Sequence, residues 1–385
     1  MFHLNKRVVA LLLVICVFVC LASSCKKNKE TSPDDGQEYV NYYDFDMTEY
    51  LNVPAEGSVQ VPLSLVDNEW EYACLKIRLD NTKYTAVEDE NAQVELYDKV
   101  KVSYLPAESS KDKLTPYQQT FLTGEDSEMI VGAGDFVSAY EHKSDPSKNT
   151  QSFEDQLKGL KVGDNKTVTV TFPDDFTYTD GEGKVSDLLA GVCVSLDLTV
   201  KGISRGELPE LNSSMVSSYT SGQYITVDEY KEYIYGYFKS YYAYEYYFDA
   251  ISLKGGYPEE ALNNARLLYM TEKIDSDYGE VELDEEDINT LYDALYNEAD
   301  EYARKAVYER MVLEYLFKVC GITLTDEGYF QMLKSDYDAM YYYYYMYYGV
   351  ATMSEYEDYF GKENLILQYK YEKMMDVLPS KVVFK

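Results

Sequence analysis

The fold of this chain is decided by residues 192–200, which read VCVSLDLTV. Apolar and polar side chains alternate along this segment, as they do in residues 100–104 (VKVSY) and 167–172 (TVTVTF). Alternation with a period of two, rich in Val and Thr, predicts antiparallel strands with one buried face. Residues 153–160 (FEDQLKGL) predict one short helix, which the turn residues KVGD close. We therefore expect a curved antiparallel sheet over one short helix for residues 94–205.

The period of the sequence changes after Gly206, and residues 206–385 are predicted to be helical throughout. Two Thr-x-x-Glu capping boxes, which begin at Thr226 and Thr352, mark helix starts. The longest helix should span residues 285–319, because neither Gly nor Pro interrupts this stretch. The predicted fold class is therefore α+β, with an all-α region after the sheet.

The first 24 residues have the pattern of a bacterial export signal. Lys6 and Arg7 precede an uninterrupted apolar run over residues 8–21, and small residues lead directly to Cys25. This pattern resembles the signal of a lipoprotein, so we expect cleavage, a lipid on Cys25, and a mature chain on the extracytoplasmic face of the cell membrane. The alternative is an uncleaved membrane anchor, but the apolar run is shorter than the roughly 20 residues that span a bilayer.

The remaining sequence divides by composition. Residues 25–46 are polar and acidic, as expected of a tether between the lipid and the first folded part. Residues 47–93 form a lead-in segment with a predicted helix at 68–79. The sheet domain then takes residues 94–205, and the helical domain takes residues 206–385.

The overall charge excludes several functions. The formal net charge is −33, with 35 Lys and Arg against 68 Asp and Glu. Nucleic acid is therefore not an expected partner, because phosphate binding needs a basic surface.

Of the two histidines, His3 leaves with the export signal, so His142 alone cannot build a His-based metal site or a Ser-His-Asp triad. We expect no metal and no cofactor.

Three cysteines remain beyond the lipidation site, at positions 74, 193 and 320. They are far apart and odd in number, which argues against a disulfide framework. We expect each to be a small buried thiol.

Tyrosine is the most unusual component of the sequence. The chain has 43 tyrosines, which concentrate after Tyr219 and form an unbroken run at 341–345. Tyrosine combines a large apolar ring with a hydroxyl at little entropic cost, which favours an adaptable surface that holds other proteins. The alternative is that about half of the rings pack between helices. Stacking on carbohydrate is a weaker third interpretation.

Four segments occur in an order that resembles the landmarks of an FKBP-type prolyl isomerase: YDKVKVSY (97–104), GAGDFV (132–137), FEDQLKGLKVGD (153–164) and FPDDF (172–176). The last two are close to the version found in trigger factor, and ELPEL (207–211) resembles the exit from that domain. Residues 302–327 and 356–377 resemble the helical arms of trigger factor. The N-terminal region lacks the basic loop with which trigger factor docks on ribosomes. The chain thus resembles a lipid-anchored trigger factor without its ribosome-binding domain.

This resemblance implies a peptidyl-prolyl cis-trans isomerase joined to a chaperone for unfolded or nascent exported polypeptides, with no ribosome as partner. Such an isomerase needs no nucleophile, because the barrier of about 18–20 kcal/mol comes from amide resonance and an apolar pocket can bind the twisted state. The resemblance places seven residues around the substrate proline: Tyr104, Phe121, Phe136, Val137, Phe153, Tyr178 and Leu196. Tyr178 would donate its hydroxyl to the substrate carbonyl. The alternative is that several of the seven only fill the core between sheet and helix.

Two departures from the family bear on catalysis. Leu122 stands where family members often carry an acidic residue, and residues 138–152 are an insertion beside the pocket. The alternative function is therefore a non-catalytic holdase with a degenerate FKBP domain, whose Tyr-rich helices bind unfolded chains. A lipoprotein that binds a small solute or glycan would need a cleft between two α/β lobes, which the helical second half does not suggest.

Overall fold

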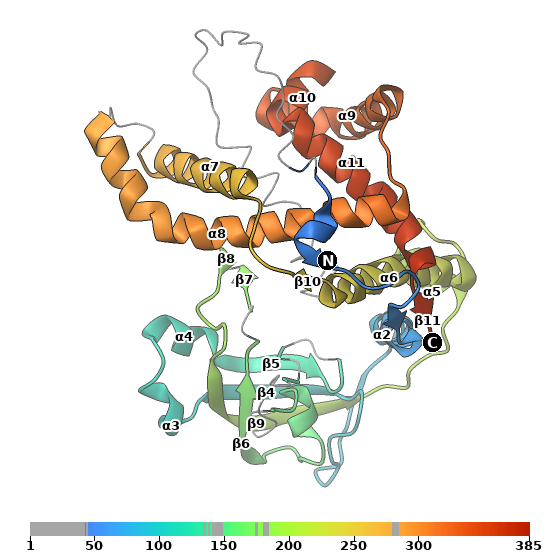
Figure 1. Cartoon of the computed structure of the whole chain (residues 1–385). Helices are drawn as coiled ribbons and strands as arrows, with labels where there is room; N and C mark the ends of the chain where they lie inside the picture. The colour runs from blue at the N-terminus through green and yellow to red at the C-terminus, as the bar shows by residue number, and fades with distance from the viewer. Residues whose placement is uncertain are drawn as a thin grey trace. The chain divides into compact units, whose positions relative to one another are not determined.

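The computed structural model describes residues 43, 45–133, 136–137, 139–140, 149–173, 176–179, 185–278 and 285–385 (Figure 1). The predicted signal peptide, Cys25 and nearly all of the predicted tether lie outside the described residues. The chain divides into two compact units: Asn68–Ile234, and a second that joins the residues up to Asp67 to Tyr235–Lys385. These units divide the chain between residues 67 and 68 and between residues 234 and 235, so they do not test the predicted domain boundaries at 94 and 206. Those boundaries stay a prediction. Among the described helices, none is long and apolar enough to cross a membrane.

The sheet of the Asn68–Ile234 unit is antiparallel and curled, as predicted (Figure 1). Its central strand, β9 (Cys193–Arg205), pairs with β4 (Lys99–Pro106) along one edge and with β6 (Asn165–Thr171) and β3 (Thr85–Ala86) along the other, while β5 (Gly124–Ile130) lies outside β4. The predicted alternation is present in β9, where every second residue from Val194 to Val200 is buried.

The expectation of three buried thiols holds for Cys320. It is wrong for Cys193, because the alternation in β9 turns this residue to the exposed face, and Cys74 is half-buried.

Three short helical elements accompany the sheet where the sequence predicts one. They are α3 (Glu108–Lys111), α4 (Pro116–Phe121) and the 3-10 turn η3 (Glu154–Leu157). The turn η3 lies within the predicted helix at 153–160, and Gly159 with φ of +81° follows it. Helix α4 begins at a capping box between Thr115 and Gln118. The unit is completed by α5 (Ser213–Tyr219), by the hairpin of β7 (Tyr178–Thr179) and β8 (Val185–Ser186), and by most of α2 (Leu63–Asp80).

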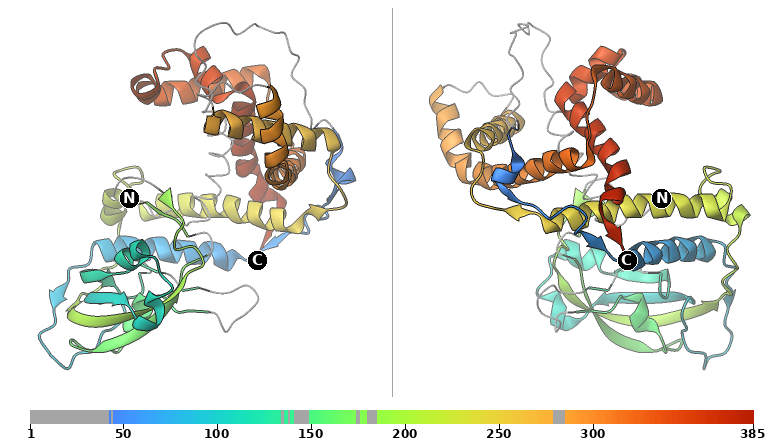
Figure 2. Two further views of the ribbon diagram at one scale, coloured as in Figure 1. Left: turned by 90° about the vertical axis from the view of Figure 1, so that its left-hand side faces the viewer. Right: turned by 45° about the vertical axis from the view of Figure 1, so that its right-hand side comes forward.

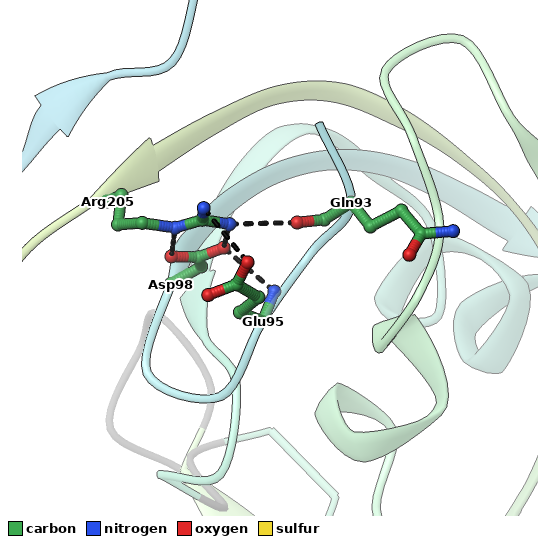
Figure 3. A network of polar contacts seen from close by, with 4 residues as sticks. All are labelled: Gln93, Glu95, Asp98 and Arg205. Atoms are coloured by element: carbon green, nitrogen blue, oxygen red, sulfur yellow. Dashed lines mark hydrogen bonds and ion pairs between the residues drawn. The ribbon is translucent and has the colours of Figure 1, made fainter. Parts of the chain in front are cut away.

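An ion pair between the buried Asp98 and the half-buried Arg205 lies at the end of β9 (Figure 3). The Arg205 guanidinium, at the end of β9, donates to both carboxylate oxygens of Asp98 at 2.9 and 2.8 Å. It also donates to the carbonyl of Gln93 at 2.8 Å and lies 3.0 Å from the Glu95 carboxylate. Asp98 is only 2% exposed. A buried carboxylate depends on such partners, so this network ties the segment before β4 to the end of β9.

The second unit is helical, as the sequence predicts for its C-terminal part. Its helices are α6 (Val227–Ala250), of which Tyr235–Ala250 falls in this unit, α7 (Glu259–Tyr278), α8 (Glu285–Cys320), α9 (Asp326–Tyr348), α10 (Met353–Phe360) and α11 (Lys362–Val377), followed by the 3-10 turn η4 (Leu378–Lys381). The predicted capping boxes at Thr226 and Thr352 are present. The predicted long helix at 285–319 is confirmed, and Gly321 with φ of +66° follows its last residue.

The N-terminal lead-in belongs partly to this helical unit. The turn η1 (Met47–Glu49) precedes β1 (Leu51–Asn52), which pairs with β10 (Ser252–Leu253); β2 (Gln60–Val61) pairs in parallel with β11 (Val383–Phe384) at the C-terminus. Met47, Leu51 and Val61 are buried in the same core as residues of α8 and α11. The segment at 47–67 therefore completes the core of the helical unit.

Helices α7 and α8 pack against each other over most of the length of α7 (Figure 2). The buried Arg266 of α7 donates to Asp300 of α8 at 2.7 Å and to Asn263 at 2.7 Å. Glu272 lies further along α7 and is half-buried. Burial, with the nearby Asp275 adding to it, raises the pKa of Glu272 to about 7 from an ordinary value near 4.5. Tyr302 of α8 also interacts with Glu272.

The raised pKa of Glu272 predicts a pH dependence of stability. Because the folded state holds the proton more tightly than the unfolded state, this group favours folding increasingly as pH falls from about 7 to 4.5. Above pH 7 the charged carboxylate is held partly desolvated and the benefit is absent. We expect Glu272→Gln to raise Tm at pH 8 by about 2–4 °C, and to change it little near pH 5. Thermal unfolding at both pH values, followed by circular dichroism, checks this. An equal shift at the two pH values would contradict the assignment.

Candidate functional site

Three aromatic rings meet at the predicted isomerase pocket in the sheet unit. Tyr104 of β4 lies 5.1 Å from Phe136 and 5.3 Å from Phe153, measured between ring centroids. Phe136 and Phe153 are 5.1 Å apart, with their planes nearly perpendicular. Such edge-to-face contacts suit aromatic quadrupoles and fix the relative orientation of the rings. The three rings therefore form one rigid apolar group, called the aromatic trio below.

The seven predicted site residues differ in how much surface they present. Phe153 and Leu196 are fully buried, Val137 is 2% exposed and Tyr104 is 7% exposed, all within the core of the sheet unit. Phe121 and Phe136 are half-buried and pack against that core. The backbone of Tyr178 lies in β7, but its side chain lies outside the described part of the chain. Six of the seven thus belong to one cluster, and their role at a substrate stays a prediction.

Two local features place the ring of Tyr104. Gly124 of β5 lies opposite Tyr104 in the register, and the ring occupies space that any side chain at position 124 would fill. Burial raises the pKa of the Tyr104 phenol, while a hydrogen bond with Ser127 opposes this. The hydroxyl of Tyr104 is therefore neutral over the ordinary pH range.

The insertion at 138–152 is joined at its base by hydrogen bonds. The Phe153 N–H donates to the carbonyl of Val137 at 3.0 Å, and Tyr140 and Thr150 exchange N–H···O bonds of 2.9 and 3.0 Å. Residues 138 and 141–148 lie outside the described residues. The aromatic trio is thus assembled across the insertion, with Phe136 before it and Phe153 after it.

One buried residue of this site is absent from the sequence-based prediction. Glu154 has no exposed surface, and its Oε1 atom accepts a hydrogen bond from the Phe136 N–H at 2.7 Å. The sequence does show an acidic residue directly after the motif phenylalanine Phe153, but so acidic a sequence offers many carboxylates. Only the fold shows that the side chain of Glu154 is buried.

Leu122, the first departure from the family pattern, is fully buried in the same core. Its side chain packs in this core, next in sequence to the half-buried Phe121, at the position where the resemblance suggests an acidic residue. The site is correspondingly less polar at this point.

In the described part of the chain, no group of three or more His, Cys, Asp or Glu side chains could hold a metal ion.

A second candidate site is the exposed aromatic surface of α9. Its inner face packs against α10 and α11: Tyr329 and Leu333 are buried, and the Tyr344 ring lies 5.2 Å from those of Tyr356 and Phe360. Its other faces carry exposed side chains, which we call the tyrosine surface: Met340, Tyr341, Tyr342, Tyr343, Tyr345, Met346, Tyr347 and Tyr348. The tyrosines after Tyr219 thus divide between core and surface. Packing between helices accounts for the buried rings, and a binding role for the exposed rings stays a prediction.

The tyrosine surface is large and carries no positive charge of its own. Tyr342 and Tyr347 are 74% and 72% exposed, which is far more than packing against the helical unit would allow. No Lys or Arg follows Lys334 in α9, and Asp336 and Asp338 lie at the base of the run. A contiguous exposed aromatic patch of this kind usually marks a site of interaction.

No family model matches the chain. Curated proteins do match it: trigger factor of Francisella tularensis subsp. novicida (strain U112) is 28% identical over 197 residues, which cover 50% of this chain and 37% of that protein. Trigger factor of Agrobacterium fabrum (strain C58) is 36% identical over 93 residues, which cover 24% of this chain and 15% of that protein. The chain is trigger factor-like. This agrees with the resemblance carried by the sequence motifs.

The similarity covers part of each relative. A solved structure of the trigger factor chaperone aligns with 86% of this trigger factor-like chain and 72% of its own, at 15% identity and a TM-score of 0.26. The matched stretches amount to 37% and 15% of the two curated trigger factors, so the chain spans well under two thirds of their length. The predicted lack of a ribosome-binding domain stays a prediction.

Proposed function

We propose that this chain is an extracytoplasmic protein-folding factor that isomerises prolyl bonds and holds unfolded exported polypeptides. The observation that carries the isomerase part is the aromatic trio. Tyr104, Phe136 and Phe153 meet in one apolar group, and the half-buried Phe136 is the member that presents surface. The similarity to trigger factors supports the folding role.

The chemistry of isomerisation matches such a site. Rotation about an X-Pro bond breaks amide resonance but forms or cleaves no covalent bond. A rigid apolar surface desolvates the imide, and it accelerates rotation to the extent that it binds the twisted state better than the planar one. In this proposal Phe136 and Phe121 contact the proline ring, while Tyr104 and Phe153 hold Phe136 in place.

The holding part of the function is assigned to the tyrosine surface. Unfolded chains expose apolar and aromatic side chains in many sequences, so a surface that binds them must tolerate variety. Tyrosine rings provide contact area with few rotatable bonds, and methionine adapts its shape to the partner. The acidic body keeps the chain soluble while this surface stays exposed.

The location is part of the same proposal. The sequence pattern before Cys25 supports lipidation there, which would hold an acidic body at a membrane that its own charge does not attract. Labelling with a radioactive fatty acid tests the anchor, and we expect the label to be lost in Cys25→Ala. Label retained in that variant would rule out Cys25 as the site.

The isomerase is tested with residues 26–385, using a short X-Pro peptide and a protein whose refolding is limited by proline isomerisation. We expect acceleration of both, and a decrease in kcat/KM of about tenfold or more in Phe136→Ala, because a ring that contacts the reacting group is lost. Tyr178→Phe tests the predicted hydroxyl donor. Phe330→Ala is the matched control, since Phe330 is an exposed phenylalanine on α9.

A non-catalytic holdase is the second candidate. It is favoured by the burial of Phe153, Val137 and Leu196, which leaves few of the predicted pocket residues with surface to offer. Suppression of aggregation by residues 26–385 without any acceleration of isomerisation would replace the first proposal with this one.

A further inference from the structure

Phe136 and Phe153 belong to the aromatic trio and lie at opposite ends of the insertion at 138–152. Their rings contact each other, but a ring contact alone does not fix the backbone that carries Phe136. That backbone is held by one strong hydrogen bond from the Phe136 N–H to Oε1 of Glu154, at 2.7 Å. Glu154 is the residue after Phe153 and begins η3, so a single short segment supplies both the ring partner and the backbone partner of Phe136.

The setting of Glu154 makes this bond strong. The side chain has no exposed surface, and a hydrogen bond is electrostatically stronger in the protein interior than in water. The neighbouring carboxylate, Asp155, contrasts with it. Asp155 accepts a hydrogen bond from the Ser152 hydroxyl at 2.8 Å and pairs with Lys158 at 2.7 Å.

We propose that Glu154 is a positioning residue of the isomerase site: its buried carboxylate fixes the Phe136 backbone and thereby the half-buried ring that meets the substrate proline. This inference depends on the proposed isomerase activity. It also explains how the pocket tolerates the insertion, because the bond to Glu154 and the Phe153 N–H bond to the Val137 carbonyl, at 3.0 Å, close the base of the insertion on both sides.

The test compares three variants of residues 26–385. Glu154→Ala removes the acceptor, Glu154→Gln keeps a neutral oxygen in nearly the same place, and Asp155→Asn alters the adjacent carboxylate as a matched control. Two readouts are measured: hydrogen exchange of the Phe136 amide by NMR, and kcat and KM for an X-Pro peptide. The amide readout needs no catalysis, and the split of kcat from KM separates positioning from general loss of structure.

In Glu154→Ala we expect Phe136 amide exchange to quicken by about 10–100-fold, the cost expected for leaving one buried N–H without its acceptor. We expect kcat to fall about tenfold with KM little changed, because a displaced ring binds the twisted state less well. Glu154→Gln should recover most of kcat while its Phe136 amide exchanges about threefold to tenfold faster than in the wild type, since a neutral acceptor is weaker. Asp155→Asn should match the wild type in both readouts.

Unchanged Phe136 exchange in Glu154→Ala, or a loss of kcat in Asp155→Asn as large as in Glu154→Ala, overturns the proposal. If Glu154→Ala does not fold, Glu154→Gln decides, and unchanged Phe136 exchange in that variant overturns it. A wild type that catalyses no isomerisation refutes the proposed activity, whereas the amide exchange still shows whether Glu154 holds Phe136.

Discussion

Arg205→Ala is expected to lower the free energy of unfolding of the sheet unit by about 3 kcal/mol, because it leaves the Asp98 carboxylate buried without its main partner. Asp98 is 2% exposed and receives two hydrogen bonds from the Arg205 guanidinium. The side chain of Arg205 is 38% exposed, which places the expected loss at the lower end of the range for buried pairs. The remaining donor to Asp98, the Glu95 N–H at 2.8 Å, cannot neutralise the charge.

The measurement is urea unfolding followed by tryptophan fluorescence, since Trp70 is the single tryptophan and lies in this unit. Lys158→Ala is the matched control: its pair with Asp155 is exposed on both sides, so we expect a loss of less than about 1 kcal/mol. Replacing Asp98 and Arg205 together by alanine should cost less than the sum of the two single losses. Equal decreases in the free energy of unfolding for Arg205→Ala and Lys158→Ala would show that the Asp98–Arg205 pair stabilises the unit no more than an exposed pair does.

Replacing Tyr342, Tyr345 and Tyr347 together by glutamine is expected to weaken binding of unfolded polypeptides by about a hundredfold. Each is half or more exposed on the tyrosine surface, and the loss of several aromatic anchors from one binding surface has effects of this size. Glutamine is a good helix former, so α9 should persist and Tm should change little. Affinity for a permanently unfolded protein, and suppression of aggregation during refolding, are the two measurements.

The control for this variant removes the same number of exposed tyrosines elsewhere in the helical unit. Tyr237, Tyr278 and Tyr296 lie on α6, α7 and α8 and are each more than a third exposed. Their replacement by glutamine should leave binding nearly unchanged. Similar losses in both triple variants would mean that binding follows total tyrosine content and not the surface of α9.

The elements that the sequence predicts well are those specified by neighbouring residues. The strands β4, β6 and β9 follow from alternation, and α8 follows from a long stretch without Gly or Pro. The capping boxes at Thr226 and Thr352 involve residues three apart, so their hydrogen bonds need no knowledge of the fold. The α+β class follows from the order of these elements.

The candidate site was predictable only in part. The motifs identify the residues that meet in the sheet unit, including all three members of the aromatic trio. They do not predict which side chains keep any exposed surface, because that depends on what packs over them. Phe153 is fully buried in the core while Phe136 is half-buried, although both are phenylalanines in motifs that resemble those of the same family. The buried carboxylate of Glu154 was not predicted for the same reason.

By itself, then, the sequence determined the period of each segment, several helix ends and the order of motifs, since these depend on residues a few positions apart. The tertiary structure alone decided which distant segments share a core. β2 pairs with β11 from the far end of the chain, and Arg205 meets Asp98 across more than a hundred residues. Contacts of this kind leave no local periodicity, because the free energy that selects them comes from burial against residues far away in the chain.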